Sequence, residues 1–252
     1  MEWEGDPGWI ALDPSWTESA WLFVKLGITH ILTGADHLLF LLCLVLPFRK
    51  LGSLVAIVTA FTVAHSITLI ASAYNLAPDA LWFPPLIETL IAVSIVYMAL
   101  ENIAGGVTLG HRWMIAFGFG LVHGFGFSFA LRETMQFAGD HLLASLLSFN
   151  VGVELGQLLV LLFLIPALEL LFRFAVAERL GTIILSALVA HVAWHWMAER
   201  WTVLSQYQIQ WPALNAALWA GVLRWAMLAV IVAGFFWLIA SLIRDRRTPR
   251  EQ

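Results

Sequence analysis

Charged residues are scarce in this chain of 252 residues. They make up 12% of the sequence, whereas soluble globular proteins carry about 25%. The hydrophobic fraction is correspondingly high, at 61%. No long stretch has the polar composition that a water-facing surface needs, so we expect no extramembrane domain. The composition predicts an integral membrane protein.

Basic residues and cysteines are also few, and both absences exclude classes of partner. The 13 Lys and Arg residues are scattered and are outnumbered by 17 Asp and Glu residues. Without a basic patch to follow a row of phosphates, nucleic acid is excluded as a partner. Cys43 is the single cysteine, so neither an intrachain disulfide nor a thiolate metal cluster can form. The first residues lack the basic n-region of a signal peptide, and we expect the first spanning helix to direct membrane insertion.

Long apolar runs are what the sequence has in abundance. A helix needs about 20 such residues to cross about 30 Å of hydrocarbon, and turn residues separate the runs. We therefore predict an all-α fold, a polytopic transmembrane bundle that forms a single domain over residues 1–252. The seven predicted spans are 21–46, 51–74, 85–101, 113–131, 142–172, 180–198 and 214–243.

The loop charges predict how this bundle is oriented. If the spans alternate in direction, nine basic residues fall on one side of the membrane and two on the other. Positive charge is enriched in cytoplasmic loops. We therefore expect residues 1–20 to form an outer segment and residues 244–252 to form a cytoplasmic tail. The nine residues are Arg49, Lys50, Arg112, Arg173, Arg179, Arg244, Arg246, Arg247 and Arg250, and the two are Arg132 and Arg200.

Away from the helix ends, ionisable side chains occur inside six of the seven predicted spans. Each costs at least about 2.5 kcal/mol at the bilayer centre on insertion scales. Counted at about 1.5 Å per residue from the outer helix ends, most lie near the midplane or in the outer half. They therefore predict one polar layer within the bundle. Its members are His30, Asp36, His37, His65, Glu88, His123, Glu154, His191 and His195.

Spacing within each span predicts which of these groups share a helix face. His30 and His37 are seven residues apart, and His191 and His195 are four apart, so each pair shares a face. Asp36 lies about 100° round the helix from His37 and can either ligate an ion or accept an imidazole N–H. The side chains that we expect to orient the ligands are Ser66, Glu88, Asn150 and Gln157.

Imidazoles with carboxylates and no thiolate suit a borderline divalent ion such as Ni²⁺, Co²⁺ or Zn²⁺. The alternative is structural, since a transmembrane histidine can be held by a hydroxyl or backbone partner and contribute only to packing. Glycine pairs at 27/34, 120/124 and 152/156 predict close approach of other helices around the polar layer. The predicted metal ligands are His30, Asp36, His37, His65, His123, Glu154, His191 and His195.

Four runs, in order along the first five predicted spans, resemble the HupE/UreJ membrane proteins, and most closely the branch not tied to hydrogenase or urease operons. They are GADHLLF at 34–40, TAFTVAHSITL at 59–69, FGLVHGFGF at 119–127 and FNVGVELGQ at 149–157. The resemblance implies a bacterial inner-membrane protein associated with nickel or cobalt movement. It also implies metal contacts from the Asp36-His37 and His123-Gly124 motifs.

A second interpretation is an enzyme. The late pair His191 and His195, with an earlier Asp and His, is similar in outline to intramembrane zinc hydrolases of the ceramidase and adiponectin-receptor type. Three histidines on Zn²⁺ would activate water, and Asp36 could act as base. Val192 stands where an HExxH zincin has glutamate, which excludes that class. An accessory role and association with further copies of the chain are also left open.

The inner halves of the predicted spans are mostly Leu, Val, Ile and Phe. Few polar residues, such as Ser53, Thr59 and Ser94, could carry an ion further. This favours a site that opens outward without a continuous polar route, although alternating access could open an inner gate.

Overall fold

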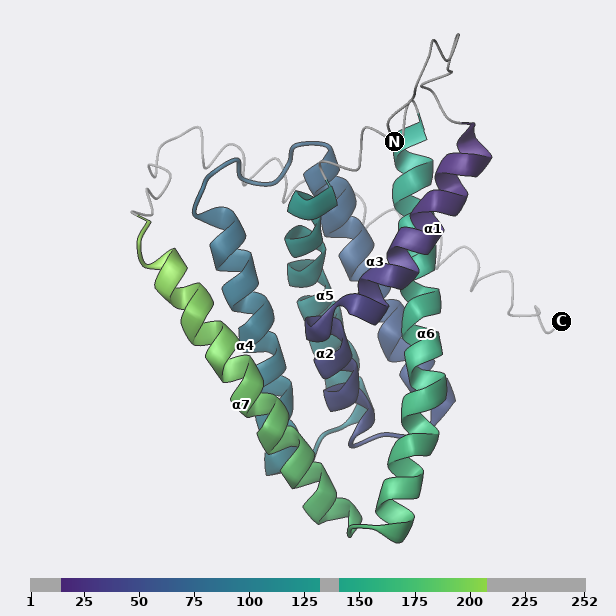
Figure 1. Cartoon of the computed structure of the whole chain (residues 1–252), viewed down its shortest axis with the longest axis vertical. Coiled ribbons are helices and arrows are strands. Elements are labelled where there is room, and N and C mark those ends of the chain that lie inside the picture. The colour runs from purple at the N-terminus through teal and green to yellow at the C-terminus, as the bar shows by residue number, and fades with distance from the viewer. Residues whose placement is uncertain (1–14, 132–140, 208–252) are drawn as a thin grey trace, which may run out of the picture. The chain divides into compact units, whose positions relative to one another are not determined.

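The computed structural model describes residues 15–131 and 141–207, which form seven helices and no strand within those ranges (Figure 1). The all-α prediction is confirmed for them. The predicted seventh span, 214–243, and both predicted end segments lie wholly or mostly outside the described residues. The helices are α1 (Trp16–Thr33), α2 (Ala35–Val45), α3 (Leu51–Ala73), α4 (Phe83–Ala104), α5 (Leu109–Leu131), α6 (Leu142–Phe174) and α7 (Glu178–Leu204).

Four of these helices, α3, α4, α6 and α7, are long and apolar enough to cross a membrane, and the bent pair α1 and α2 makes a fifth candidate. The chain is therefore a membrane protein that contacts the lipid bilayer. Helix α5 coincides with the predicted span 113–131 but is not among these candidates. The count of seven spans and the orientation of the two ends stay predictions.

The first predicted span, 21–46, is wrong as a single continuous helix. It divides at Gly34, and the two halves, α1 and α2, are bent by 69°. Gly34 has φ −76° and ψ 100°, outside the helical region, and glycine is a weak helix former. A Cβ at this position would lie 2.7 Å from the His30 carbonyl and 3.0 Å from the Asp36 carboxylate. The break puts His30 in the last turn of α1 and Asp36 in the first turn of α2.

Glycines let two helix pairs pack with their backbones in close contact, as predicted. Gly120 and Gly124 of α5 face the backbone of Phe61 and His65 in α3, where a Cβ would clash. Removing the Cβ lets the two helices approach. Because Gly124 lies directly against the carbonyl of His65, this packing also fixes where His65 stands.

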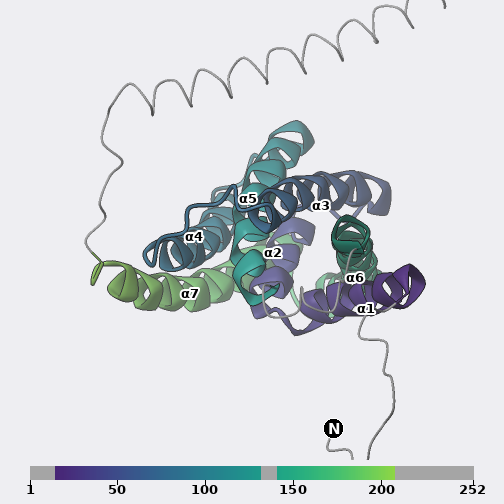
Figure 2. The same cartoon turned by 90° about the horizontal axis from the view of Figure 1, so that it is seen from above.

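Gly27 of α1 faces the Phe149 carbonyl, and Gly152 of α6 faces the Val24 carbonyl. The pairs α1–α6, α3–α5 and α4–α7 make the most extensive helix contacts, and the short α2 lies between them (Figures 1 and 2). Gly34 was expected to allow helix approach as well, and that stays a prediction. The atoms nearest to it belong to the same bend, in His30, Asp36 and His37.

Candidate metal centre

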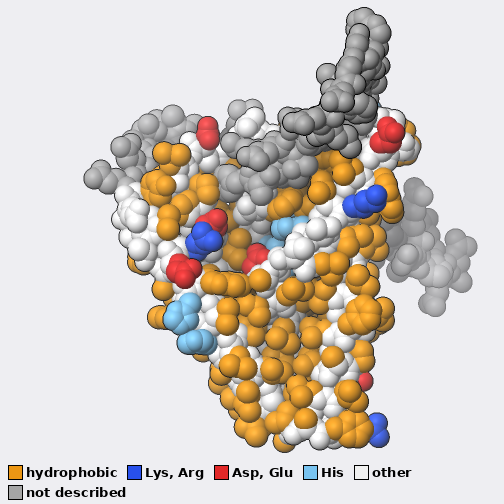
Figure 3. Space-filling model, viewed as in Figure 1, with side chains coloured by type: hydrophobic (Ala, Val, Ile, Leu, Met, Phe, Trp, Pro, Cys, Tyr) orange, Lys and Arg blue, Asp and Glu red, His pale blue; other side chains and the backbone are white. Residues whose placement is uncertain are grey.

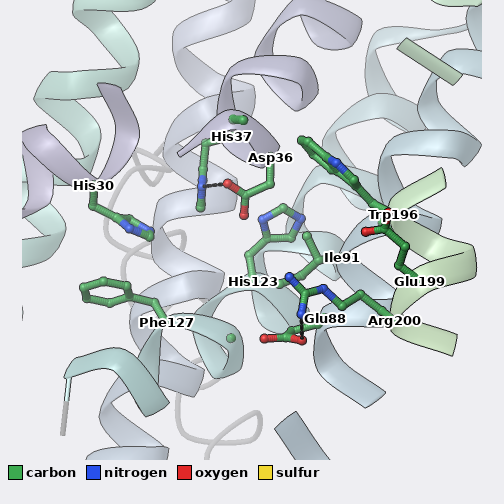
Figure 4. A pocket seen from close by; sticks show the side chains of 13 residues that line it. His30, Asp36, His37, Glu88, Ile91, His123, Phe127, Trp196, Glu199 and Arg200 are labelled. Atoms are coloured by element: carbon green, nitrogen blue, oxygen red, sulfur yellow. Dashed lines mark hydrogen bonds and ion pairs between the residues drawn. The ribbon is translucent and has the colours of Figure 1, made fainter. Parts of the chain in front are cut away.

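Four histidines from four helices come together in the bundle. His37 of α2 is central, with ring centroids 4.6 Å from His30 of α1, 5.2 Å from His123 of α5 and 6.5 Å from His65 of α3. His65 is fully buried, and His37 and His123 are nearly so. Figure 4 shows His30, His37 and His123 around one space, with Asp36 beside them. The bend at Gly34 brings the rings of His30 and His37 together. They do not share one face of a straight helix, although their spacing predicted that.

The hydrogen bond between His37 and Asp36 fixes which nitrogen of His37 carries the proton. His37 Nδ1 lies 3.1 Å from Asp36 Oδ1. A carboxylate only accepts, so the Nδ1–H donates. The remaining nitrogen, Nε2, then has a lone pair, and it is buried without a hydrogen-bond partner among the described residues.

His65 has the same arrangement with an amide in place of the carboxylate. Its Nδ1 lies 3.0 Å from Asn150 Oδ1. The Asn150 amide orientation follows from its NH₂ group, which donates to the Leu146 carbonyl at 2.9 Å. His65 Nδ1–H therefore donates, and its Nε2 is a buried acceptor with no partner in the described part of the chain.

His123 repeats this arrangement with its two nitrogens exchanged. Its Nε2 lies 3.1 Å from Ser94 Oγ. The Ser94 hydroxyl donates its proton to the Ile91 carbonyl at 2.6 Å, so its oxygen accepts from the His123 Nε2–H. His123 Nδ1 is left with a lone pair, and within residues 15–131 and 141–207 it finds no partner.

These nitrogens suit a divalent metal ion. A buried polar group without a partner costs about 1–3 kcal/mol, and a bound ion is one way to satisfy such groups. His30 Nε2 is a fourth unpartnered nitrogen of this kind within the described residues. The donors form two groups, each with ligand atoms within 4.8 Å of one another: His30, His37 and His65, and Asp36, His37 and His123. Metal-bound imidazoles commonly donate their other N–H to a carboxylate or carbonyl, as His37 and His65 do.

A cavity of about 520 Å³ gives access to the cluster. His30, Asp36, His37 and His123 line it, and most of its other walls come from α4, α5 and α7. Figure 3 shows charged side chains and histidine around a hollow in a largely apolar face. Figure 4 shows an ion pair at this cavity between Glu88 and Arg200, which lie 3.1 Å apart. The predicted residue Glu88 therefore pairs with Arg200 beside the cavity and contacts none of the imidazoles by any hydrogen bond that the structure shows.

Three other predicted residues lie on the packing surface between α3 and α6 or close to it. Glu154 Oε1 accepts a hydrogen bond from Thr59 at 2.6 Å, and its Oε2 is buried without a partner in the described region. Gln157 accepts one from Thr62 at 2.9 Å. Ser66 donates to the Thr62 carbonyl of its own helix at 2.7 Å. The structure therefore shows Ser66 bonded along α3 and not to an imidazole.

His191 and His195 lie apart from the cluster. Their ring centroids are 4.6 Å apart on α7, as their spacing predicted, but both side chains are exposed. Ala193, midway between them, is fully buried, and residues two positions away point about 160° from it. Helix α7 instead lines the cavity with Trp196, Glu199 and Arg200.

Sequence reasoning missed two functional partnerships. Ser94 holds His123, and Arg200 holds Glu88, although Ser94 had been noted only as a polar residue and Arg200 only as a loop charge. Each pair joins two helices, so spacing within one span could not connect them. The polarity of Ser94 inside an apolar span was the one indication in the sequence.

Together these features define a class: a polytopic helical membrane protein with an intramembrane histidine and carboxylate cluster that could hold a divalent metal ion. The chain matches the family described as HupE / UreJ protein over residues 8–200, and it belongs to that family. The resemblance of the four sequence runs is thereby confirmed. Comparison with curated proteins and with solved structures gave no match.

Proposed function

We propose that the protein binds a divalent metal ion, nickel or cobalt, at the histidine cluster and moves it across the bacterial inner membrane. The observation that carries this proposal is the set of buried lone pairs on His37, His65 and His123. Each of these imidazoles donates its proton to the protein and leaves its other nitrogen unpartnered in the described region. Family membership supports a metal-related role.

A polar ladder between α3 and α6 supports transport over simple storage. Beyond His65, Thr62 bonds to Gln157 and Thr59 bonds to Glu154, so polar contacts continue past the cluster. Thr62 and Thr59 precede His65 by about 4.5 and 9 Å of helix rise, toward the end of α3 expected to be cytoplasmic. The inner halves of the spans are mostly apolar in sequence, but these polar pairs of α3 and α6 offer one route for an ion. The sequence of a single span does not reveal it, because each pair joins two helices.

The topology within this proposal is seven spans with an outer N-terminus. It rests on the nine-to-two distribution of basic residues in the loops. A reporter fused after Gln252 should be active in the cytoplasm. Activity of that fusion only in the periplasm would overturn the orientation.

The structure supports the hydrolase alternative less well. That interpretation used His191 and His195 as zinc ligands, and these side chains are exposed on the side of α7 opposite the buried Ala193. A three-histidine zinc site with an open fourth position would have to use the cluster itself. The proposed ligands are accordingly His30, Asp36, His37, His65 and His123, with Glu154 as a later contact.

Uptake of radiolabelled nickel or cobalt by cells that express the protein tests transport, with Glu154→Gln as the informative variant. This change keeps the side-chain volume but removes the charge offered to a desolvated cation. We expect uptake to fall steeply while the purified variant still binds metal. Glu169→Gln is the matched control, since Glu169 is an exposed carboxylate on the same helix.

Two results would contradict transport. One is wild-type accumulation by Glu154→Gln cells, and the other is no accumulation above background by the unmodified protein. Stoichiometric metal in the purified protein, found together with the second result, would leave a binding or accessory role.

A further inference from the structure

His37 belongs to both groups of donor atoms. One group combines it with Asp36 and His123, and the other combines it with His30 and His65. Two donors of one ion can be no farther apart than twice the metal–nitrogen distance of about 2.1 Å, which is about 4.2 Å. Small shifts suffice to close either group of three around an ion. The five donors do not form one group, so a single ion cannot take all of them at once.

The two groups differ in depth and in charge. Asp36, His37 and His123 all line the cavity, and so does His30, whereas His65 does not and has no exposed surface. The first group, here called the outer station, contains a carboxylate. The second group, here called the inner station, consists of His30, His37 and His65 and contains imidazoles alone. An ion that enters through the cavity therefore meets the charged station first.

Beyond the inner station the polar contacts continue. His65 is bonded to Asn150, and the Thr62–Gln157 and Thr59–Glu154 pairs follow between α3 and α6. The inner station thus lies between the cavity and the polar ladder. His37 is the residue common to both steps.

We propose that the metal ion occupies these two stations alternately and that His37 passes it from the outer station to the inner one. This rests on the proposed metal-binding function. Because the Asp36 carboxylate holds the proton on His37 Nδ1, Nε2 is the one lone pair that His37 can offer. The outer and inner stations compete for it, and each chain holds one ion at a time. The transfer exchanges ligands only, with no redox step.

The test uses the purified full-length chain in detergent, with Ni²⁺ titration calorimetry, metal analysis after gel filtration and Co²⁺ absorption spectra. We expect one ion per wild-type chain. His65→Ala removes a ligand found only in the inner station, and His123→Ala removes one found only in the outer station. Each variant should still bind one ion, and their Co²⁺ spectra should differ because only the outer station has an oxygen ligand.

His37→Ala should lower affinity by more than about 100-fold, because it removes a ligand from both stations. This loss is larger than the one caused by changing a hydrogen-bond partner of a ligand. His191→Ala is the control, since that exposed residue belongs to neither group. Gel filtration and metal-free thermal unfolding check that each variant is folded. His65→Asn and His123→Asn replace any alanine variant that is not.

Three results would overturn the proposal. Two ions bound per wild-type chain would show simultaneous filling. Loss of all binding in both His65→Ala and His123→Ala, with the wild type binding one ion, would show a single site and leave the metal-binding function intact. No binding by the wild-type chain would refute the proposed function itself.

Discussion

Two polar clusters lie within this bundle, and the way each satisfies its groups differs. Near the end of α4, the fully buried Arg112 lies 3.2 Å from the Glu101 carboxylate and donates to Asn102 at 2.7 Å. Asn102 in turn donates to the Cys43 carbonyl at 2.8 Å. In the Arg112 cluster the charges pair with one another, although Arg112 Nε has no hydrogen-bond partner among the described residues. The histidine cluster instead leaves lone pairs on His37, His65 and His123 without partners among the described residues.

The contrast distinguishes polar groups that hold helices together from polar groups that could bind a ligand. A buried charge is strongly destabilising when its partner is removed, and the Arg112 cluster supplies that partner from within the chain. In the histidine cluster, only one nitrogen of each of His37, His65 and His123 has a partner in the described part of the chain. Removing a residue should therefore affect folding in one cluster and metal binding in the other.

The largest effect is expected from Arg112→Met. It removes the buried arginine from Glu101, whose side chain is 14% exposed and which keeps, within the described residues, only the more exposed His111 ring at 3.0 Å. Breaking a buried pair costs about 3–5 kcal/mol, so unfolding in detergent should require correspondingly less denaturant. Arg49→Met is the control, because the Arg49–Glu178 pair is more exposed and should be worth about 1 kcal/mol or less. Equal losses in the two variants would contradict the distinction.

The second prediction concerns stabilisation by the metal. Nickel at 100 times its dissociation constant should stabilise the wild-type chain by about 2.7 kcal/mol. His37→Ala should lose this gain while its metal-free stability stays close to that of the wild type. Thermal unfolding with and without nickel measures both quantities. A gain retained by His37→Ala would place the metal outside the histidine cluster.

The third prediction uses two glycines on α5. A Cβ at Gly124 would clash with Thr68 and the His65 carbonyl, whereas at Gly118 it would meet nothing within 4 Å. Gly124→Ala should cost about 1–3 kcal/mol through overpacking and should also weaken nickel binding, because it displaces His65. Gly118→Ala should leave binding unchanged and raise stability by up to about 1 kcal/mol. Equal effects on nickel affinity would show that the α3–α5 packing does not position His65.

The polar layer could be predicted because ionisable residues stand out against apolar spans. His65 and His123 each lie in a continuous helix, so their depth followed from counting residues. The glycine pair at 120 and 124 was equally readable, since close helix approach needs the Cβ removed at two positions one turn apart. These predictions depend on local sequence alone.

Other features depend on contacts between helices, and spacing could not give them. Gly34 could have been accommodated within a helix, and its spacing in the sequence did not indicate the 69° bend that the structure has there. His191 and His195 match the polar layer in depth, but which face of α7 is buried depends on its contact with α4. Asn150 and Ser94, the acceptors that hold His65 and His123, come from helices distant in sequence.

The smallest predicted effect distinguishes two serines. Ser94 accepts the Nε2–H of His123, which leaves His123 Nδ1 free for a metal ion. Loss of an outer hydrogen bond of this kind typically costs 10–100-fold in metal affinity. Because the inner station keeps its ligands, the effect is clearest in the His65→Ala background, where we expect Ser94→Ala to weaken nickel binding by about tenfold, at the lower end of that range.

Ser66→Ala is the matched control for this prediction. The Ser66 hydroxyl donates to the Thr62 carbonyl within α3, so its removal changes no imidazole contact that the structure shows. Calorimetric titration of both variants with nickel separates the two serines. Unchanged affinity in Ser94→Ala would mean that His123 binds no metal or that its free nitrogen does not depend on Ser94. Replacing His123 itself with Ala would then decide between these two explanations. Unchanged nickel affinity would mean that His123 binds no metal, and lowered affinity would mean that its free nitrogen does not depend on Ser94.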